Sequence, residues 1–167
     1  MIVVVSLAAC GDKAESAKAE APVVPQVKVV SKIETVKTNK SVMSNADIQC
    51  LAKNIYHEAG VESRAGKIAV AQVTMNRLDS GDYGKTVCKV VYAKSQFSWT
   101  LNKKLRNETP KGELWQESLA IAKEFARGVR AKGMANIDHY HTDYIRKPFW
   151  AHKKQALLKV GQHIFYS

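Results

Sequence analysis

Glu58 is the side chain of this sequence best placed for acid–base chemistry. Apolar residues recur at helical spacing through residues 48–59, and Glu58 lies on the flank of the stripe that they form. A carboxylic acid at an apolar rim has its ionised form disfavoured, which raises its pKa toward neutrality. Such an acid can protonate a leaving group, so Glu58 is a candidate general acid. On spacing alone, a solvated surface role is the commoner alternative for a glutamate at a helix end.

The histidines offer a second kind of chemistry, the binding of a metal ion. His139 and His141 are two residues apart, so on a strand they would share a face. With His57 or His163 they could hold Zn²⁺, as in a zinc-dependent peptidase. The segment that starts at His57 begins like the His-Glu-x-x-His motif, but Val61 stands where the second histidine is required. We therefore expect hydrogen-bonded structural histidines and no metal, and keep the zinc enzyme as an alternative.

Three helical segments are predicted to position these side chains. Ser44 is a suitable N-cap for a first helix over 44–59, which carries the candidate acid near its end. Ser63 can cap a second helix over 63–78, whose few polar residues predict a central, nearly enclosed position. A third helix is expected over 109–133, because Thr-Pro opens it and glycine closes it.

Shorter elements complete the predicted fold. Alternation with period two predicts strands at 137–141 and 162–166. A short helix is expected over 151–160, and residues 87–92 fit either a short helix or a strand. The sequence thus predicts a helix-dominated α+β fold with a small antiparallel sheet.

Length and charge limit the number of domains and the kind of partner. With 167 residues, the chain fits one compact domain and a tail. The net charge of +11 calls for a polyanionic partner. Lysine and arginine are scattered along the chain rather than clustered on one helix, so specific nucleic-acid binding is not expected.

The N-terminal region has the features of a lipoprotein signal and a linker. Residues 1–10 join a short apolar run to Leu-Ala-Ala-Cys, which resembles a bacterial lipobox and makes Cys10 a candidate lipidation site. The run is shorter than a membrane span and lacks a positively charged start, so a nonspecific apolar N-terminus is the alternative. Residues 11–44 contain no aromatic side chain and are expected to be a flexible linker, which leaves 45–167 as the domain.

Cys50 and Cys88 are the two other cysteines. In an exported protein, two thiols left after lipidation are expected to pair, so we predict a Cys50–Cys88 disulfide. Two ordinary buried cysteines are the alternative.

Several stretches of the chain occur together, in this order and at these spacings, in one known family. They are Cys50-Leu51-Ala52, Ile55-Tyr56-His57-Glu58-Ala59, Gly66-Lys67-Ile68-Ala69-Val70-Ala71-Gln72-Val73, Asn76-Arg77, Thr86-Val87-Cys88-Lys89-Val90-Val91-Tyr92, Gln96-Phe97-Ser98-Trp99, His139-Tyr140-His141, Trp150-Ala151 and Gly161-Gln162-His163-Ile164-Phe165-Tyr166. The set spans about residues 46–166 and resembles the SleB/CwlJ-type cell wall hydrolases.

This resemblance implies a lysozyme-like, peptidoglycan-cleaving enzyme related to lytic transglycosylases, with Glu58 as the catalytic acid and no cofactor. One position departs from the family pattern, Glu-Ala-Arg-Gly-Glu, because Gly60 stands where the family has arginine. Any contact made by that arginine is therefore in doubt, but the acid is not.

A glycan substrate also points to the residues that would line its groove. Sugars present hydroxyl groups and patches of C–H, so amides and aromatic faces suit them, although core packing is as common a role for any single aromatic. The candidate substrate-binding residues are Gln96, Phe97, Ser98, Trp99, Tyr140, His141 and Tyr166.

Two outcomes of glycan cleavage remain open at this stage. A second carboxylate would give hydrolysis by a muramidase or glucosaminidase, whereas without one the muramoyl 6-hydroxyl would attack and leave a 1,6-anhydro end. Asp79, Asp82, Asp138 and Glu62 are available, but none has a spacing that requires partnership with Glu58. The family likeness favours the transglycosylase.

The resulting hypothesis is an exported, monomeric enzyme of the bacterial envelope, tethered to the membrane through Cys10, or a bacteriophage endolysin. Its partner is the peptidoglycan glycan strand. The alternatives are the zinc peptidase and a noncatalytic module that binds cell wall or another polyanion.

Overall fold

Helix α1 (Asn45–Ala59) carries the candidate acid and begins where the sequence predicted. In the computed structural model, which describes residues 27–38 and 43–167, the Ser44 side chain accepts a hydrogen bond from the Asp47 N–H at 3.1 Å. Leu51 and Ile55 are fully buried on the apolar face of this helix. The stripe therefore faces the core, and Glu58 lies at its edge.

Helix α2 (Arg64–Ser80) is the central helix, as predicted. Ser63 caps its N-terminus, accepting from the Gly66 N–H at 3.3 Å, and Gly81 ends it with a φ of 75°, a conformation that favours glycine. The helix is buried along most of its length, including the polar Gln72 and Arg77. Gln72 is satisfied by the main chain, because its Oε1 accepts from the Ala131 N–H at 2.7 Å.

The remaining helices enclose α1 and α2. They are α3 (Val87–Val91), the 3₁₀ turn η1 (Ser98–Leu101), α4 (Lys103–Asn107) and α5 (Glu113–Ala126). Helix α5 packs along α1 through the buried Trp115, Ile121 and Phe125. Cys50 of α1 and Cys88 of α3 are joined as a disulfide, with their Cα atoms 5.2 Å apart.

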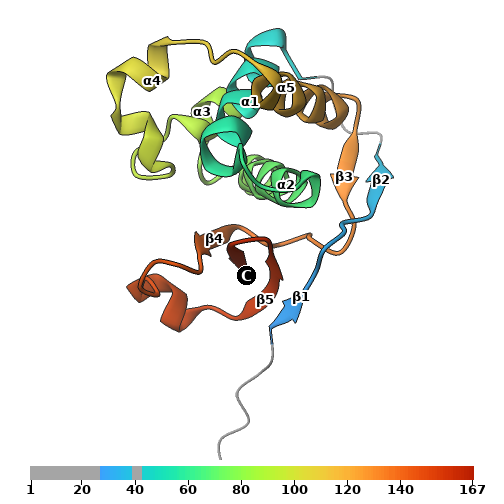
Figure 1. Ribbon diagram of the computed structural model, residues 1–167, viewed down its shortest axis with the longest axis vertical. Coiled ribbons are helices and arrows are strands. Elements are labelled where there is room, and N and C mark those ends of the chain that lie inside the picture. Colours follow the sequence, from blue (N-terminus) through green and yellow to red (C-terminus); the bar gives the residue numbers. More distant parts are fainter. Residues whose placement is uncertain (1–26, 39–42) are drawn as a thin grey trace, which may run out of the picture.

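The strands form two small sheets beside the helices (Figure 1). The larger has the order β1-β5-β6-β4 and consists of β1 (Lys28–Val29), β5 (Ala156–Val160), β6 (His163–Tyr166) and β4 (His139–Thr142). Its strands are antiparallel except β1, which runs parallel to β5, so the sheet is mixed rather than purely antiparallel. The smaller pairs β2 (Thr35–Lys37) with β3 (Val129–Ala131). The helix-dominated α+β fold class is confirmed.

Two of the predicted helices differ from the structure. The third long helix was expected to begin at Thr109 and Pro110, but α5 begins at Glu113, because Gly112 adopts a non-helical φ of 87° just before it. The third long helix ends at Ala126 rather than near residue 133, because Gly128 adopts a φ of 86° and the chain turns into β3. A side chain at Gly128 would also collide with the Thr38 carbonyl oxygen. The helix expected over 151–160 is instead the 3₁₀ turn η2 (Phe149–Lys153) followed by β5, which has a strand partner on each side.

The described part of the expected linker is also structured differently from the prediction. Residues 28–29 and 35–37 form edge strands that pair with β5 and β3. The absence of aromatic residues does not prevent this pairing, because main-chain hydrogen bonds to existing strands require no core of their own. The predicted signal segment 1–10, Cys10 and residues 11–26 lie outside the described residues. In the described part of the chain, no helix has the length and apolar character needed to cross a membrane.

Candidate active site

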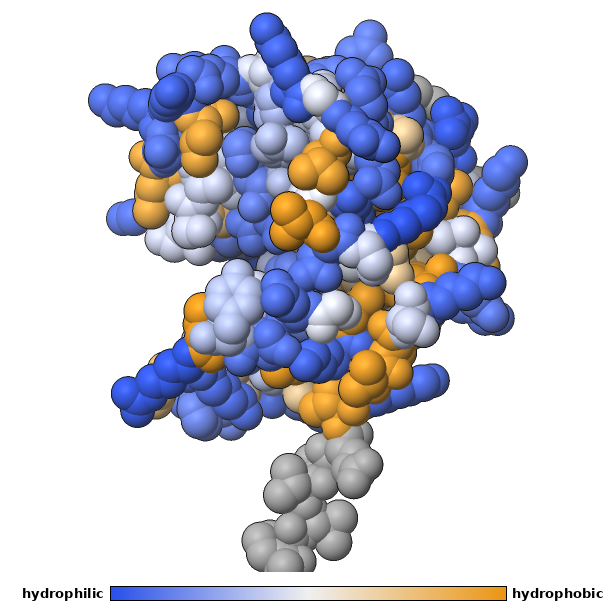
Figure 2. Space-filling view, in the orientation of Figure 1, coloured by the Kyte–Doolittle hydropathy of each residue, from blue (hydrophilic) through white to orange (hydrophobic). Residues whose placement is uncertain are grey.

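A cleft of about 480 Å³ separates the helices from the strands. Figure 2 shows the surface hollowed between the helical part and the segment that follows β4. One wall consists of the end of α1, the last turn of α2 and the segment 96–99, and the other of β4, β6 and residues 144–150. The predicted site residues that line it are Glu58, Gln96, Phe97, Ser98, Trp99, Tyr140 and His141.

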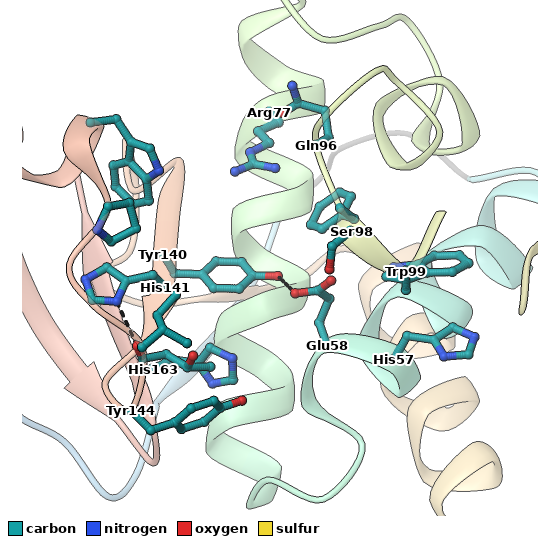
Figure 3. A pocket seen from close by; sticks show the side chains of 15 residues that line it. His57, Glu58, Arg77, Gln96, Ser98, Trp99, Tyr140, His141, Tyr144 and His163 are labelled. Atoms are coloured by element: carbon teal, nitrogen blue, oxygen red, sulfur yellow. Dashed lines mark hydrogen bonds between the residues drawn. The ribbon is translucent and has the colours of Figure 1, made fainter. Parts of the chain in front are cut away.

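Glu58 extends from α1 toward the opposite wall, as Figure 3 shows. The Tyr140 hydroxyl of β4 donates a hydrogen bond to its Oε2 at 2.9 Å. Burial raises the pKa of Glu58 above its ordinary value of 4.5, while the Tyr140 hydrogen bond and the positive charge of Arg77 oppose the rise. The acid is thus held partly out of water with its proton affinity increased, as general acid catalysis requires.

Tyr140 remains a hydrogen-bond donor at all ordinary pH values. Its own burial, with the nearby Glu58 carboxylate, raises the pKa of the phenol well above its ordinary value of 10.0. Its ring packs against Phe165 and stands edge-on to His163, with centroids 5.5 Å and 5.2 Å away. The strands therefore fix the direction from which Glu58 receives its hydrogen bond.

Arg77 is a cleft residue that the sequence analysis did not single out. Its guanidinium lies over the rings of Tyr83 and Phe97, at 5.3 Å and 5.1 Å from their centroids, and its Nε donates to the Asp138 carbonyl at 2.8 Å. Arg77 is 6% exposed and its Nη1 has no hydrogen-bond partner. An arginine inside the most extensively buried helix was the signal that could have identified it, because a charge is seldom buried there without a function.

Trp99 and Phe97 form the cleft wall mainly as core residues. Trp99 donates from Nε1 to the Asn54 Oδ1 at 2.9 Å, and His57 stacks on its ring at a centroid distance of 4.5 Å. Both aromatic residues are less than one-tenth exposed. The polar Ser98 and Gln96 beside them are more open to solvent.

Tyr166 is the one predicted substrate-binding residue that does not line the cleft. Its ring stacks behind His141 at a centroid distance of 5.4 Å, and its hydroxyl is 2.9 Å from the His141 Nε2. The other His141 ring nitrogen, Nδ1, is 2.8 Å from the Thr142 carbonyl oxygen. Period two placed Tyr166 on β6 correctly, but the alternation cannot tell the cleft side of a strand from the buried side.

His163, Tyr144 and Trp150 also line the cleft and were not predicted as substrate-binding residues. His163 was expected to be a structural histidine, with metal binding as the alternative. Within residues 27–38 and 43–167, no group of three or more histidine, cysteine, aspartate or glutamate side chains is arranged to hold a metal ion. Both nitrogens of His141 are already engaged, which does not favour the zinc alternative.

The other candidate carboxylates lie away from the cleft. Asp138 is 2.6 Å from the His139 Nδ1 and pairs with Lys154 at 3.2 Å, and it lines a separate cavity together with Asp79. Asp82 is exposed on the loop after α2, and Glu62 faces the turn between β5 and β6. Among the described residues, Glu58 is therefore the only carboxylate that lines the cleft.

Comparisons with known proteins agree with this architecture. The model of a family described as Cell Wall Hydrolase matches residues 61–166, a match that begins just after Glu58. A spore cortex-lytic enzyme of Oceanobacillus iheyensis is 29% identical over 126 residues, which are 73% of this chain and 42% of that enzyme. The spore cortex-lytic enzyme of Bacillus subtilis is 26% identical, with coverage of 73% and 38%. This chain thus spans about two-fifths of the length of these curated relatives.

Two solved structures share the fold. The catalytic domain of the germination-specific lytic transglycosylase SleB from Bacillus anthracis superimposes with a TM-score of 0.61 at 26% identity, covering 79% of this chain and all of that domain. The catalytic domain of the Bacillus cereus SleB protein gives a TM-score of 0.60 at 24% identity, covering 78% and 95%.

Proposed function

Because this chain belongs to the cell wall hydrolase family, we propose that it cleaves the glycan strands of peptidoglycan with Glu58 as the general acid. The observation that carries the proposal is the position of Glu58, alone among the described carboxylates in the cleft and hydrogen-bonded to Tyr140. The names of the relatives, cortex-lytic enzyme and lytic transglycosylase, support the same class of reaction.

In the proposed reaction, the protonated Glu58 gives its proton to the glycosidic oxygen that links N-acetylmuramic acid to N-acetylglucosamine. The C1–O bond breaks as the muramoyl ring gains oxocarbenium character. The Glu58 carboxylate can then take the proton from the muramoyl 6-hydroxyl as that oxygen bonds to C1. The products are a 1,6-anhydro end and a new free hydroxyl on the leaving sugar, and Glu58 is protonated again.

The single carboxylate favours this transglycosylase reaction over hydrolysis. A retaining hydrolase needs a second carboxyl group about 5 Å from the first, and an inverting one needs it at roughly 6.5–9.5 Å across the cleft. Asp79, Asp82, Asp138 and Glu62 do not line this cleft. The intramolecular hydroxyl replaces the water that a second carboxylate would activate.

The substrate groove is proposed to use both walls. Gln96 and Ser98 offer polar groups on one side, and Tyr140 and His141 on the other. Phe97 and Trp99 form the apolar wall, and Tyr166 supports His141 from behind. We expect no metal or organic cofactor in this reaction.

Mass spectrometry of digested sacculi tests the proposal. We expect anhydro-muropeptides from the parent chain and none from Glu58→Gln. Reducing ends in place of anhydro ends would show that the reaction is hydrolysis and not transglycosylation. Intact glycans with cut peptides would refute glycan cleavage. Glu124→Gln is a matched control, because this carboxylate pairs with Arg64 outside the cleft at 2.6 Å.

Location and assembly complete the proposal. An enzyme that acts on the wall must be exported, and a lipid on Cys10 would tether the domain to the membrane beside its substrate. An exported protein also meets the oxidising conditions in which the Cys50–Cys88 disulfide persists. We propose a monomer, from a bacterium or acting as a phage endolysin, whose net charge of +11 favours the anionic cell wall.

A further inference from the structure

Glu62 is a buried carboxylate that the proposed reaction does not use. It lies in the turn after α1, where its main-chain N–H donates to the Ala59 carbonyl at 3.0 Å, and its side chain is 8% exposed. Its Oε1 accepts from the Gln162 N–H at 3.3 Å and lies 3.8 Å from the His163 Nδ1. Glu62 therefore connects the turn after α1 with the turn between β5 and β6.

Two glycines leave room for this carboxylate. A Cβ at Gly161 would overlap the Glu62 Oε2, and a Cβ at Gly66 would lie 2.9 Å from the Glu62 Cβ. Gly161 also has a φ of 55°, which favours glycine. The β5–β6 turn and the start of α2 are thus shaped around Glu62, so it is a built contact rather than a surface charge that happens to be covered.

His163 lies between Glu62 and the cleft residue Tyr140. It is 2% exposed, and its Nδ1 is buried without a hydrogen-bond partner. Burial lowers the pKa of His163, the nearby carboxylates of Glu62 and Asp143 oppose this, and His141 adds to it. Asp143 is itself paired with Lys159 of β5 at 2.5 Å, which leaves Glu62 as the carboxylate directed at His163 from the helical side.

Tyr140 forms the last link, because its ring stands edge-on to His163, with an interplanar angle of 82°, and its hydroxyl donates to Glu58. The contacts run from Glu62 to His163, then to Tyr140 and back to Glu58, and so close a ring across the cleft. We propose that Glu62 is a positioning residue, which acts through His163 to hold the Tyr140 hydroxyl on the catalytic acid. This inference rests on the proposed role of Glu58.

Glu62→Gln isolates the charge of Glu62 from its shape. Glutamine keeps the volume and an oxygen that accepts from the Gln162 N–H, but it lacks the negative charge that faces the His163 Nδ1. Tyr140 is then held less firmly, and its hydrogen bond, which lowers the pKa of Glu58, weakens. We expect kcat to fall by about tenfold with KM little changed, and the limb where activity falls with rising pH to move to higher pH.

A double-mutant cycle separates this role from a general structural one. Tyr140→Phe should give the same direction of shift, and Glu62→Gln should add nothing further in the Tyr140→Phe background. His163→Phe, which keeps a ring but cannot pair with Glu62, provides a second route should Glu62→Gln fail to fold. If the effects of Glu62→Gln and Tyr140→Phe multiply, the proposal is wrong.

Carbon-13 NMR titration of the Glu58 carboxyl in the full chain tests the proposal without relying on turnover. We expect Glu62→Gln to raise the pKa of Glu58 and the control Glu124→Gln to leave it unchanged. Removing a negative charge that acted only through space would lower this pKa, so a fall, or no change, would overturn the proposal. Failure of the proposed function would appear separately, as a parent chain that releases no glycan fragments while the titration still responds to Glu62→Gln.

Discussion

The two walls of the cleft are built in different ways. The helical wall rests on the main apolar core, in which Leu51, Ile55, Val70 and Val73 are fully buried, and it presents the acid from the end of a well-packed helix. The strand wall is a small four-stranded sheet that brings polar aromatic residues together, with His141, His163 and Tyr166 all less than one-tenth exposed. The helices therefore fix the position of Glu58, whereas the strands help to set its proton affinity.

The largest effect should come from the acid itself. Glu58→Gln keeps the shape of the side chain but cannot donate a proton, so we expect release of glycan fragments to fall by about a thousandfold or more. The rate of turbidity loss of purified cell walls measures this, with circular dichroism to show that the fold is retained. A variant as active as the parent would show that Glu58 is not the general acid.

The disulfide should dominate the stability of the helical side. Its cysteines are 38 residues apart, and Cys50→Ser with Cys88→Ser should lower the free energy of unfolding by about 2–4 kcal/mol. Urea denaturation of the parent and the double variant gives the difference, and Ellman titration of the unfolded parent should detect neither of these two thiols. Free thiols at both positions would show that the cysteines are unpaired in solution.

The destabilisation of the fold by the buried Glu58 carboxylate should depend on pH. Because the pKa of Glu58 is raised on folding, the folded chain is destabilised as pH rises from 4.5 through the folded pKa. Glu58→Gln removes this penalty, so its melting temperature should exceed that of the parent at neutral pH, and the difference should vanish below pH 4.5. A difference in melting temperature that is the same at every pH would contradict the raised pKa of Glu58.

Arg77→Met tests the contribution of the helical wall to proton affinity. The positive charge of Arg77 lowers the pKa of Glu58, so its removal should raise that pKa further. Glu58 then stays protonated to higher pH, and the basic limb of the pH–rate profile should move upward. Methionine retains much of the contact with Tyr83 and Phe97, and a melting curve controls for lost packing.

The smallest effect is expected farthest from the cleft. Val29 is 75% exposed on the edge strand β1, so Val29→Ser should change the free energy of unfolding by less than about 0.5 kcal/mol and leave activity unchanged. Urea denaturation checks the first expectation, and the cell-wall assay checks the second. A clear loss of activity would show that β1 supports the site after all.

The sequence alone was enough to predict the parts of the molecule that local patterns specify. The N-caps Ser44 and Ser63 start their helices as expected, because a serine hydroxyl beside an apolar stripe is a local signal. The position of Glu58 at the edge of the core follows from the period of the same helix. The final strand, predicted over residues 162–166 from its alternation, is found at His163–Tyr166.

Only the tertiary structure decided which side chains meet. The hydrogen bond between Tyr140 and Glu58 joins residues 82 positions apart, and the contact of Gln162 with Glu62 spans 100 positions. Distant strands also decide the pairing of β1 with β5 and of β2 with β3. They likewise decide that residues 156–160 form a strand rather than a helix and that Tyr166 lies behind the cleft. Periodicity fixes the face of an element, but the partner of that face is chosen by packing between segments that the local sequence does not relate.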